Sequence, residues 1–220
     1  MSRGSSVFLH ALGADAEKLA PEVLAYASGP PDGMIGVGDG VFAVAGSPWR
    51  WMLRLAAPFV GPGLLVPRHE PDVPFTIIER PAADPRGQPR LAASRTLRFR
   101  GGLERFDDVL RAGRAPRTLV NVVGDDGRLE ILLEASVTDD GALRLTTRSS
   151  RVRVFGRAIR LPRALGIDGV VENGYDERRA RGTIIARMRN PLVGTLMEYR
   201  GWFRYEHRRA PEQTGASQYE

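Results

Sequence analysis

From residue 73 onward, apolar residues recur at every second position, and this alternation constrains the fold more than any other feature. The clearest run is 129–137, where Leu129, Ile131 and Leu133 alternate with Glu130 and Glu134. A β-strand directs successive side chains to opposite faces, so such a run has one apolar and one mainly polar face. Comparable runs predict strands at residues 73–80, 91–100, 119–123, 129–137, 142–147, 152–155, 159–161, 170–175, 183–189 and 195–206.

Short turns separate several of these strands. The triplets 125–127 and 139–141 both read Asp-Asp-Gly, and such residues favour the tight turns of antiparallel hairpins. The same reasoning predicts a hairpin at 38–40, between short strands at 34–37 and 41–45. Many short strands without alternating helices argue against a parallel sheet and for an antiparallel sheet that curls to hide its edges.

Three segments have helical spacing or helix-start signals. A helix is expected at 15–28, where Asp15 can cap the start and Pro21 either bends the helix or delays its beginning. A second is expected at 48–59 after Ser47-Pro48, and a third at 103–114 from the spacing of Phe106, Val109 and Leu110. The predicted fold is therefore α+β and β-rich: about ten antiparallel strands curled into a barrel or half-barrel, with two or three packing helices. We expect one domain over residues 1–206 and a flexible tail over 207–220.

Composition excludes several classes of protein. The chain has 220 residues, 42% hydrophobic and 26% charged, which is typical of a globular domain. It has no cysteine, so thiolate metal sites, disulfides and cysteine nucleophiles are excluded. Its three histidines, at 10, 69 and 207, are too scattered to predict a metal site. The apolar stretch at the N-terminus is short and contains His10, so we expect an uncleaved start and a cytoplasmic protein.

The positive charge is concentrated in one stretch. The whole chain has a formal charge of +6, and all its basic residues except Lys18 are arginine. Residues 141–167 hold seven arginines and no acidic residue. This stretch predicts a patch that weakly attracts anionic surfaces, with Arg144, Arg148, Arg151, Arg153 and Arg157 as its members. Specific nucleic-acid recognition is not expected, because one aromatic residue, Phe155, is interleaved and no base-stacking motif accompanies the arginines.

Several short pieces of the sequence resemble a known family. They are Gly-Pro-Gly at 61–63, Val-Pro-Phe at 73–75, Arg-Thr-Leu-Arg-Phe at 95–99, Gly-Arg-Leu-Glu at 127–130, Leu-Arg-Leu at 143–145, Leu-Pro at 161–162, Pro-Leu-Val-Gly at 191–194 and the segment 198–205. In order and spacing they resemble domain-of-unknown-function family 4166, over about residues 19–206. The resemblance implies a bacterial domain, found alone or fused to saccharopine-dehydrogenase-like domains. It implies no catalytic residues.

Motifs for catalysis or cofactor binding are missing from the sequence. The glycines at 36, 38 and 40 do not match a dinucleotide fingerprint, which needs a third glycine at position 41, where Val41 stands. No serine lies in a Gly-x-Ser-x-Gly elbow. We therefore predict no cofactor and no catalytic residue, and an enzyme of unknown reaction stays open as an alternative, with Glu198 as its starting point if buried. The other interpretation of Glu198 is an ion pair with an arginine on a neighbouring strand.

Two functions follow from a curled sheet of this composition. The first is a binding module for a hydrophobic or amphipathic small molecule in a sheet-enclosed cavity. Its predicted lining is Arg95, Phe99, Tyr175, Glu198, Tyr199 and Trp202, with Arg95 as the anchor for an acidic head group; the alternative is that these side chains fill a core. The second is a module for a membrane surface or a protein partner, accessory to an oxidoreductase, acting through the arginines or through the aromatic helix at 48–59. The sequence does not predict the oligomeric state.

Overall fold

The computed structural model describes residues 6–48, 68–124, 127–154, 157–192 and 194–210. Two short helices precede the sheet: α1 (Val7–Leu12) and α2 (Pro21–Ala27), joined by the 3-10 turn η1 (Gly13–Lys18). The side chain of Ser6 caps α1 by accepting a hydrogen bond from the backbone N–H of Phe8 at 3.2 Å. The predicted helix at 15–28 is thus shorter than expected, since α2 begins at Pro21, where the missing N–H costs nothing.

The rest of the described chain is built of strands. They are β1 (Met34–Gly46), β2 (His69–Ala83), β3 (Pro89–Phe99), β4 (Gly102–Ala112), β5 (Thr118–Val123), β6 (Leu129–Val137), β7 (Leu143–Val154), β8 (Arg157–Arg160), β9 (Asp168–Asp176), β10 (Arg181–Asn190) and β11 (Gly194–Arg209). Two further 3-10 turns, η2 (Arg163–Leu165) and η3 (Glu177–Arg179), flank β9.

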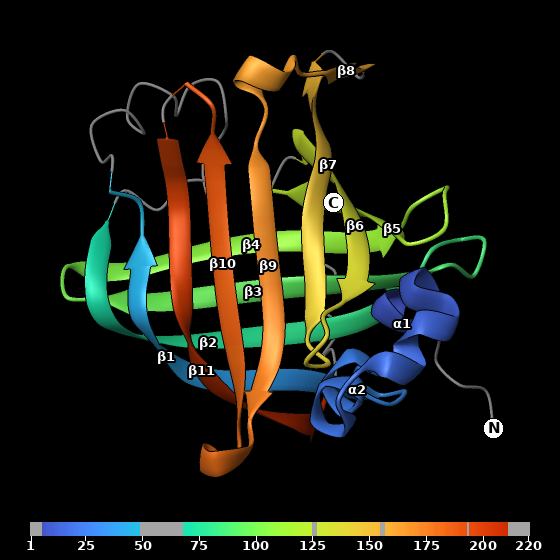
Figure 1. Ribbon diagram of the computed structural model, residues 1–220, viewed down its shortest axis with the longest axis vertical. Coiled ribbons are helices and arrows are strands. Elements are labelled where there is room, and N and C mark those ends of the chain that lie inside the picture. The colour runs from blue at the N-terminus through green and yellow to red at the C-terminus, as the bar shows by residue number, and fades with distance from the viewer. Residues whose placement is uncertain (1–5, 49–67, 125–126, 155–156, 193, 211–220) are drawn as a thin grey trace, which may run out of the picture.

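The strands form a closed antiparallel barrel. Each strand from β1 to β7 pairs with the next, β7 pairs with β9, and the series continues to β11, which pairs back onto β1. Ten of the strands that the structure describes close this ring, and the short β8 extends it as an extra strand on β7. Figure 1 shows β9, β10 and β11 crossing in front of β2, β3 and β4, with the two helices at one end and β8 at the other. The predicted β-rich antiparallel barrel is confirmed.

Two predicted elements are wrong. Residues 103–114 are not a helix but mainly the strand β4, and residues 38–40 are not a turn but the middle of the long strand β1. On β4 the inward positions are Phe106, Asp108 and Leu110, so a buried charged residue hides the period of two. The predicted helix at 48–59 falls, beyond Pro48, outside the described residues.

The C-terminal strand is longer than expected. β11 continues to Arg209, and its residues 207–209 pair with β1 through Gly36, Ile35 and Met34. The start of the predicted tail is therefore part of the barrel wall. This extension brings the end of β11 close to α2.

Candidate functional site

The barrel interior holds two apolar clusters. One contains Leu110, Ile131 and Leu143, and is covered by apolar residues of α1 and α2. The other contains Phe75, Leu97 and Phe203. On β4, Asp108 separates Phe106, which packs against the second cluster, from Leu110 of the first. Polar side chains therefore lie between two apolar clusters, inside the barrel.

Successive side chains of a strand point to opposite faces of the barrel wall, so some predicted site residues point inward and others outward. Phe99 and Tyr199 are buried in the second apolar cluster, and Arg95 faces the same interior with 17% of its side chain exposed. Tyr175 is partly buried and lines a pocket beside α2. The structure thus places four of the six predicted residues inside the barrel or at one of its ends.

The other two predicted residues lie on the outer face of β11. Glu198 pairs with Arg187 of β10 at 3.8 Å and with His69 at 3.3 Å, so the ion-pair interpretation is the one that the structure shows. The guanidinium of Arg181 lies over the ring of Trp202, 4.5 Å from the ring centroid. Both alternate with the inward Tyr199 and Phe203, so neither lines the interior.

Arg95 is already paired. Its guanidinium forms an ion pair with Asp108, whose side chain is 3% exposed, and lies 5.3 Å from the centroid of the Phe106 ring. A buried arginine in this setting has its charge compensated by the neighbouring carboxylate. The prediction that Arg95 anchors an acidic head group therefore finds no uncompensated charge to support it.

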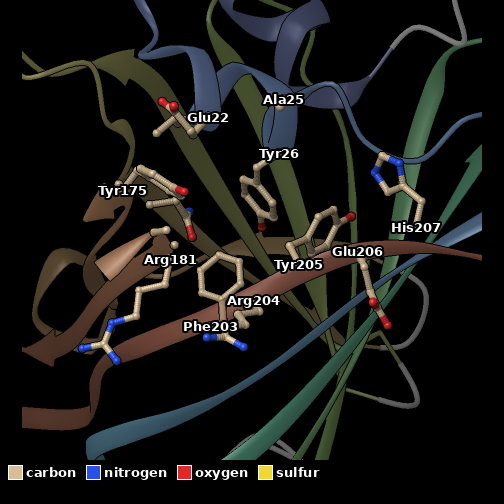
Figure 2. A pocket seen from close by; sticks show the side chains of 15 residues that line it. Glu22, Ala25, Tyr26, Tyr175, Arg181, Phe203, Arg204, Tyr205, Glu206 and His207 are labelled. Atoms are coloured by element: carbon tan, nitrogen blue, oxygen red, sulfur yellow. The ribbon is translucent and has the colours of Figure 1, made fainter. Parts of the chain in front are cut away.

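A pocket of about 400 Å³ lies between α2 and the ends of β9, β10 and β11 (Figure 2). We call it the α2 pocket. Its inner wall is largely aromatic, with Tyr26, Tyr175, Phe203 and Tyr205. The rings of Phe203 and Tyr205 both stand roughly edge-on to that of Tyr26, with centroids at 5.6 and 5.0 Å. Its remaining lining residues are Glu22, Val23, Ala25, Asn173, Gly174, Ala180, Arg181, Gly182, Arg204, Glu206 and His207.

Asn173 is the most informative polar residue of the α2 pocket. It is 4% exposed, and its side-chain oxygen has no hydrogen-bond partner among the described residues. Leaving a buried acceptor unpaired costs about 1–3 kcal/mol. The inward side of β9 therefore carries a buried acceptor whose hydrogen-bonding capacity is unused within the described part of the chain.

A carboxylate and two phenols meet at the same end of the barrel. Glu79 of β2 is 2% exposed; Tyr26 donates to its Oε1 at 3.1 Å, and Tyr205 donates to its Oε2 at 2.7 Å. Burial raises the pKa of the Glu79 carboxyl, although the two hydrogen bonds and nearby positive charge oppose this. Burial and the adjacent Glu79 also raise the pKa of Tyr26 and of Tyr205, so both phenols stay protonated donors at neutral pH.

A second pocket, of about 800 Å³, lies on the other side of Tyr26. We call it the N-terminal pocket. Glu79, Phe8 and Leu91 border it, together with the loop 28–33 that follows α2 and the ends of β1, β2 and β3. Tyr26 lines both pockets. Its ring therefore forms part of the wall between two hollows at the helical end of the barrel.

Sequence reasoning missed Tyr26, Glu79, Asn173 and Tyr205. A signal was present for Glu79, since it continues the inward series Val73, Phe75 and Ile77 of β2. A charged residue at an inward position of a strand indicates a buried partner or a functional site. Tyr26 carried no comparable signal, because its place depends on how α2 docks against the barrel.

The arginine-rich stretch is largely neutralised by its neighbours. Arg144 donates to Glu172 of β9 at 2.8 and 3.0 Å, Arg148 pairs with Glu134, and Arg153 pairs with Glu130 at 2.6 Å. These carboxylates come from β6 and β9, which lie on either side of β7. The predicted patch therefore loses most of its net charge once the strands pair.

Two kinds of feature are absent from the described residues. Among the residues 6–210 that the structure describes, no cluster of three or more metal-ligating side chains occurs. Within the same residues, no helix is long and apolar enough to cross a membrane.

Comparison with known proteins supplies the family. The model of the family described as Domain of unknown function (DUF4166) matches residues 19–203. The chain belongs to this family. It is also 28% identical over 137 residues to the uncharacterized protein YndH of Bacillus subtilis (strain 168), a match that covers 62% of this chain and 67% of that protein. The resemblance read from the sequence is thus confirmed, and DUF4166 membership covers all the barrel strands except the last residues of β11.

Proposed function

We propose that this DUF4166 domain is a binding module that takes up a small hydrophobic or amphipathic molecule at the helical end of its barrel. The observation that carries the proposal is the α2 pocket, which is lined by aromatic rings together with Asn173, a buried side chain whose oxygen has no hydrogen-bond partner among the described residues. Small-molecule sites in proteins are mostly apolar hollows of about 300–1,000 Å³ with a few placed polar groups, often at the mouth of a barrel. Both pockets at this end fall within that range of volume.

Titration of the full chain with Nile red, a neutral hydrophobic fluorophore, tests this proposal. We expect saturable one-to-one binding at micromolar concentration, and at least about fivefold weaker binding in Tyr175→Ala, because that ring is part of the pocket wall. The matched control is Ile185→Ala, on the outer face of β10 with 54% exposure, which should bind as the parent does. Absence of saturable binding, or equal loss in both variants, would overturn the proposal.

A second candidate function is contact with an anionic membrane surface through the β8 rim, by which we mean β8 and η2. Ile159 and Leu165 are 54% and 59% exposed there. Arg157, Arg160 and Arg163 lie beside them, and none has a carboxylate partner in the described part of the chain. Apolar side chains flanked by unpaired cations are typical of interfacial segments.

Co-sedimentation with vesicles tests this candidate. The chain should pellet with vesicles of phosphatidylserine and phosphatidylcholine at low salt, but not with phosphatidylcholine alone. Replacing Arg157, Arg160 and Arg163 by glutamine should remove the binding, whereas Arg144→Gln should not, since that side chain is already paired with Glu172. If the parent chain stays in the supernatant with anionic vesicles at low salt, the β8 rim has no such role.

A further inference from the structure

The barrel interior carries an uncompensated negative charge. Of the inward-facing residues that the structure describes, three combine a charged side chain with strong burial: Glu79, Arg95 and Asp108. Arg95 and Asp108 form an ion pair and cancel each other. Glu79 has only phenolic hydroxyls as hydrogen-bond partners. When Glu79 is ionised, these three residues together therefore carry a net charge of −1, because Arg95, the one cation among them, is also paired with Asp108.

A buried carboxylate without a counter-charge is costly, so it either keeps a proton or faces a cation. Glu79 borders the N-terminal pocket, whose wall beside it is apolar and aromatic, with Phe8, Tyr26 and Leu91. Aromatic faces attract organic cations through the quadrupole of the ring. Carboxylate, aromatic rings and a hollow of about 800 Å³ thus occur together at one place.

Three other charged residues line the N-terminal pocket: Asp32, Arg80 and Arg90. Arg80 is exposed, and Arg90 faces Asp84 with 4.0 Å between the nearest charged atoms. Asp32 is exposed on the loop after α2, whereas His207, beyond Tyr205 on β11, is exposed and lines the α2 pocket. Glu79 is the most buried of the charged residues that line this pocket.

We infer that the N-terminal pocket binds the basic nitrogen of an amphipathic amine, with Glu79 as its counter-ion and Tyr26, Phe8 and Leu91 as its apolar wall. This inference rests on the proposed binding function and names its ligand class. It replaces the acidic head group expected from Arg95 by a cationic one, because the structure pairs Arg95 with Asp108 and gives Glu79 no ion pair of its own among the described residues.

Calorimetric titration of the full chain with octylamine and, separately, with octanol tests the inference, since the two ligands differ in charge and have the same alkyl chain. The parent protein should bind octylamine at least about tenfold more tightly than octanol. Glu79→Gln should abolish this preference and keep octanol binding, because the amide has a similar shape without the charge. Asp39→Asn, which removes a carboxylate from the outer face of β1, is the matched control and should keep the preference.

The outcomes separate the inference from the proposed function. Equal binding of octylamine and octanol by the parent protein would overturn the amine assignment and leave the binding module intact. Failure of Nile red, octylamine and octanol alike to bind would overturn both. If Glu79→Gln does not fold, the preference of the parent protein still decides, and Glu79→Asp serves as the variant that keeps the charge.

Discussion

Gly36 on β1 lies directly beneath the hydroxyl of Tyr205, and a Cβ at this position would lie 1.8 Å from Tyr205 Oη. The same hydroxyl donates to Glu79 at 2.7 Å. A residue without a side chain is therefore required for the phenol to reach the carboxylate. This requirement explains the glycine at position 36 of a strand, where glycine is otherwise unfavourable.

Gly36→Ala should therefore lower the free energy of unfolding by at least about 2 kcal/mol, because Tyr205 must move and Glu79 loses a donor. Chemical denaturation of the parent and the variant measures the change. Ala43→Ser, at an exposed position of the same strand, is the control and should change stability by less than about 0.5 kcal/mol. A loss of less than about 0.5 kcal/mol in Gly36→Ala would contradict the assigned contact.

Glu79 should also leave a signature in the pH dependence of stability. Its pKa is raised by burial in the folded state, so the folded protein holds the proton more tightly than the unfolded chain. The free energy of unfolding should then fall, relative to Glu79→Gln, as the pH rises from about 4 through the folded pKa. Urea denaturation of both proteins at pH 4 and pH 8 measures this. A difference that stays constant, or that changes in the opposite direction, would contradict the buried state of Glu79.

At the scale of elements, β4 shows how a buried ion pair misleads sequence reasoning. The spacing of Phe106, Val109 and Leu110 is helical, whereas the strand turns Phe106, Asp108 and Leu110 inward. An inward aspartate is recognisable only when its partner, Arg95 on β3, is known. The runs with uninterrupted alternation, such as β6, were predicted at their observed bounds.

Breaking the β3–β4 ion pair on one side should be far more damaging than replacing it. Asp108→Ala leaves the Arg95 charge buried without a partner and should cost about 3–5 kcal/mol of unfolding free energy. The double variant Arg95→Met with Asp108→Leu should stay within about 1.5 kcal/mol of the parent, because apolar pairs of similar volume can replace buried ions. Denaturation curves of the single and double variants decide. Equal losses in both would show that the pair contributes through more than its charge.

Pairing with residues on neighbouring strands also explains why the arginine-rich stretch is largely neutral in the folded protein. Its charge is a property of the linear sequence, whereas Glu130, Glu134 and Glu172 come from other strands and neutralise it after folding. Sequence separation between the partners hides the pairing. Charge counted along a strand predicts a surface field only when its neighbours are also counted.

At the scale of the whole molecule, the sequence predicted a β-rich antiparallel barrel or half-barrel and the β5–β6 and β6–β7 pairs, because alternation and turn chemistry are local. Closure of β11 on β1 and the docking of α2 against β9 are contacts between distant residues, and they build the two pockets. Of the predicted site residues, Tyr175 lines the α2 pocket, whereas Trp202 and Glu198 lie on the outer face of the barrel. The position of a pocket residue such as Tyr26 depends on this long-range docking, so the sequence did not predict it.

The central claim is that ligand binds at the helical end of the barrel and not on its outer wall. Amide chemical shifts of the isotope-labelled chain, recorded while octylamine is added, test this most directly. The account predicts saturable shifts at Phe8, Tyr26, Glu79 and Leu91, which line the N-terminal pocket, with little change at the outer-face residues Ile185 and Trp202. Shifts confined to the outer face, or to the β8 rim, would contradict it.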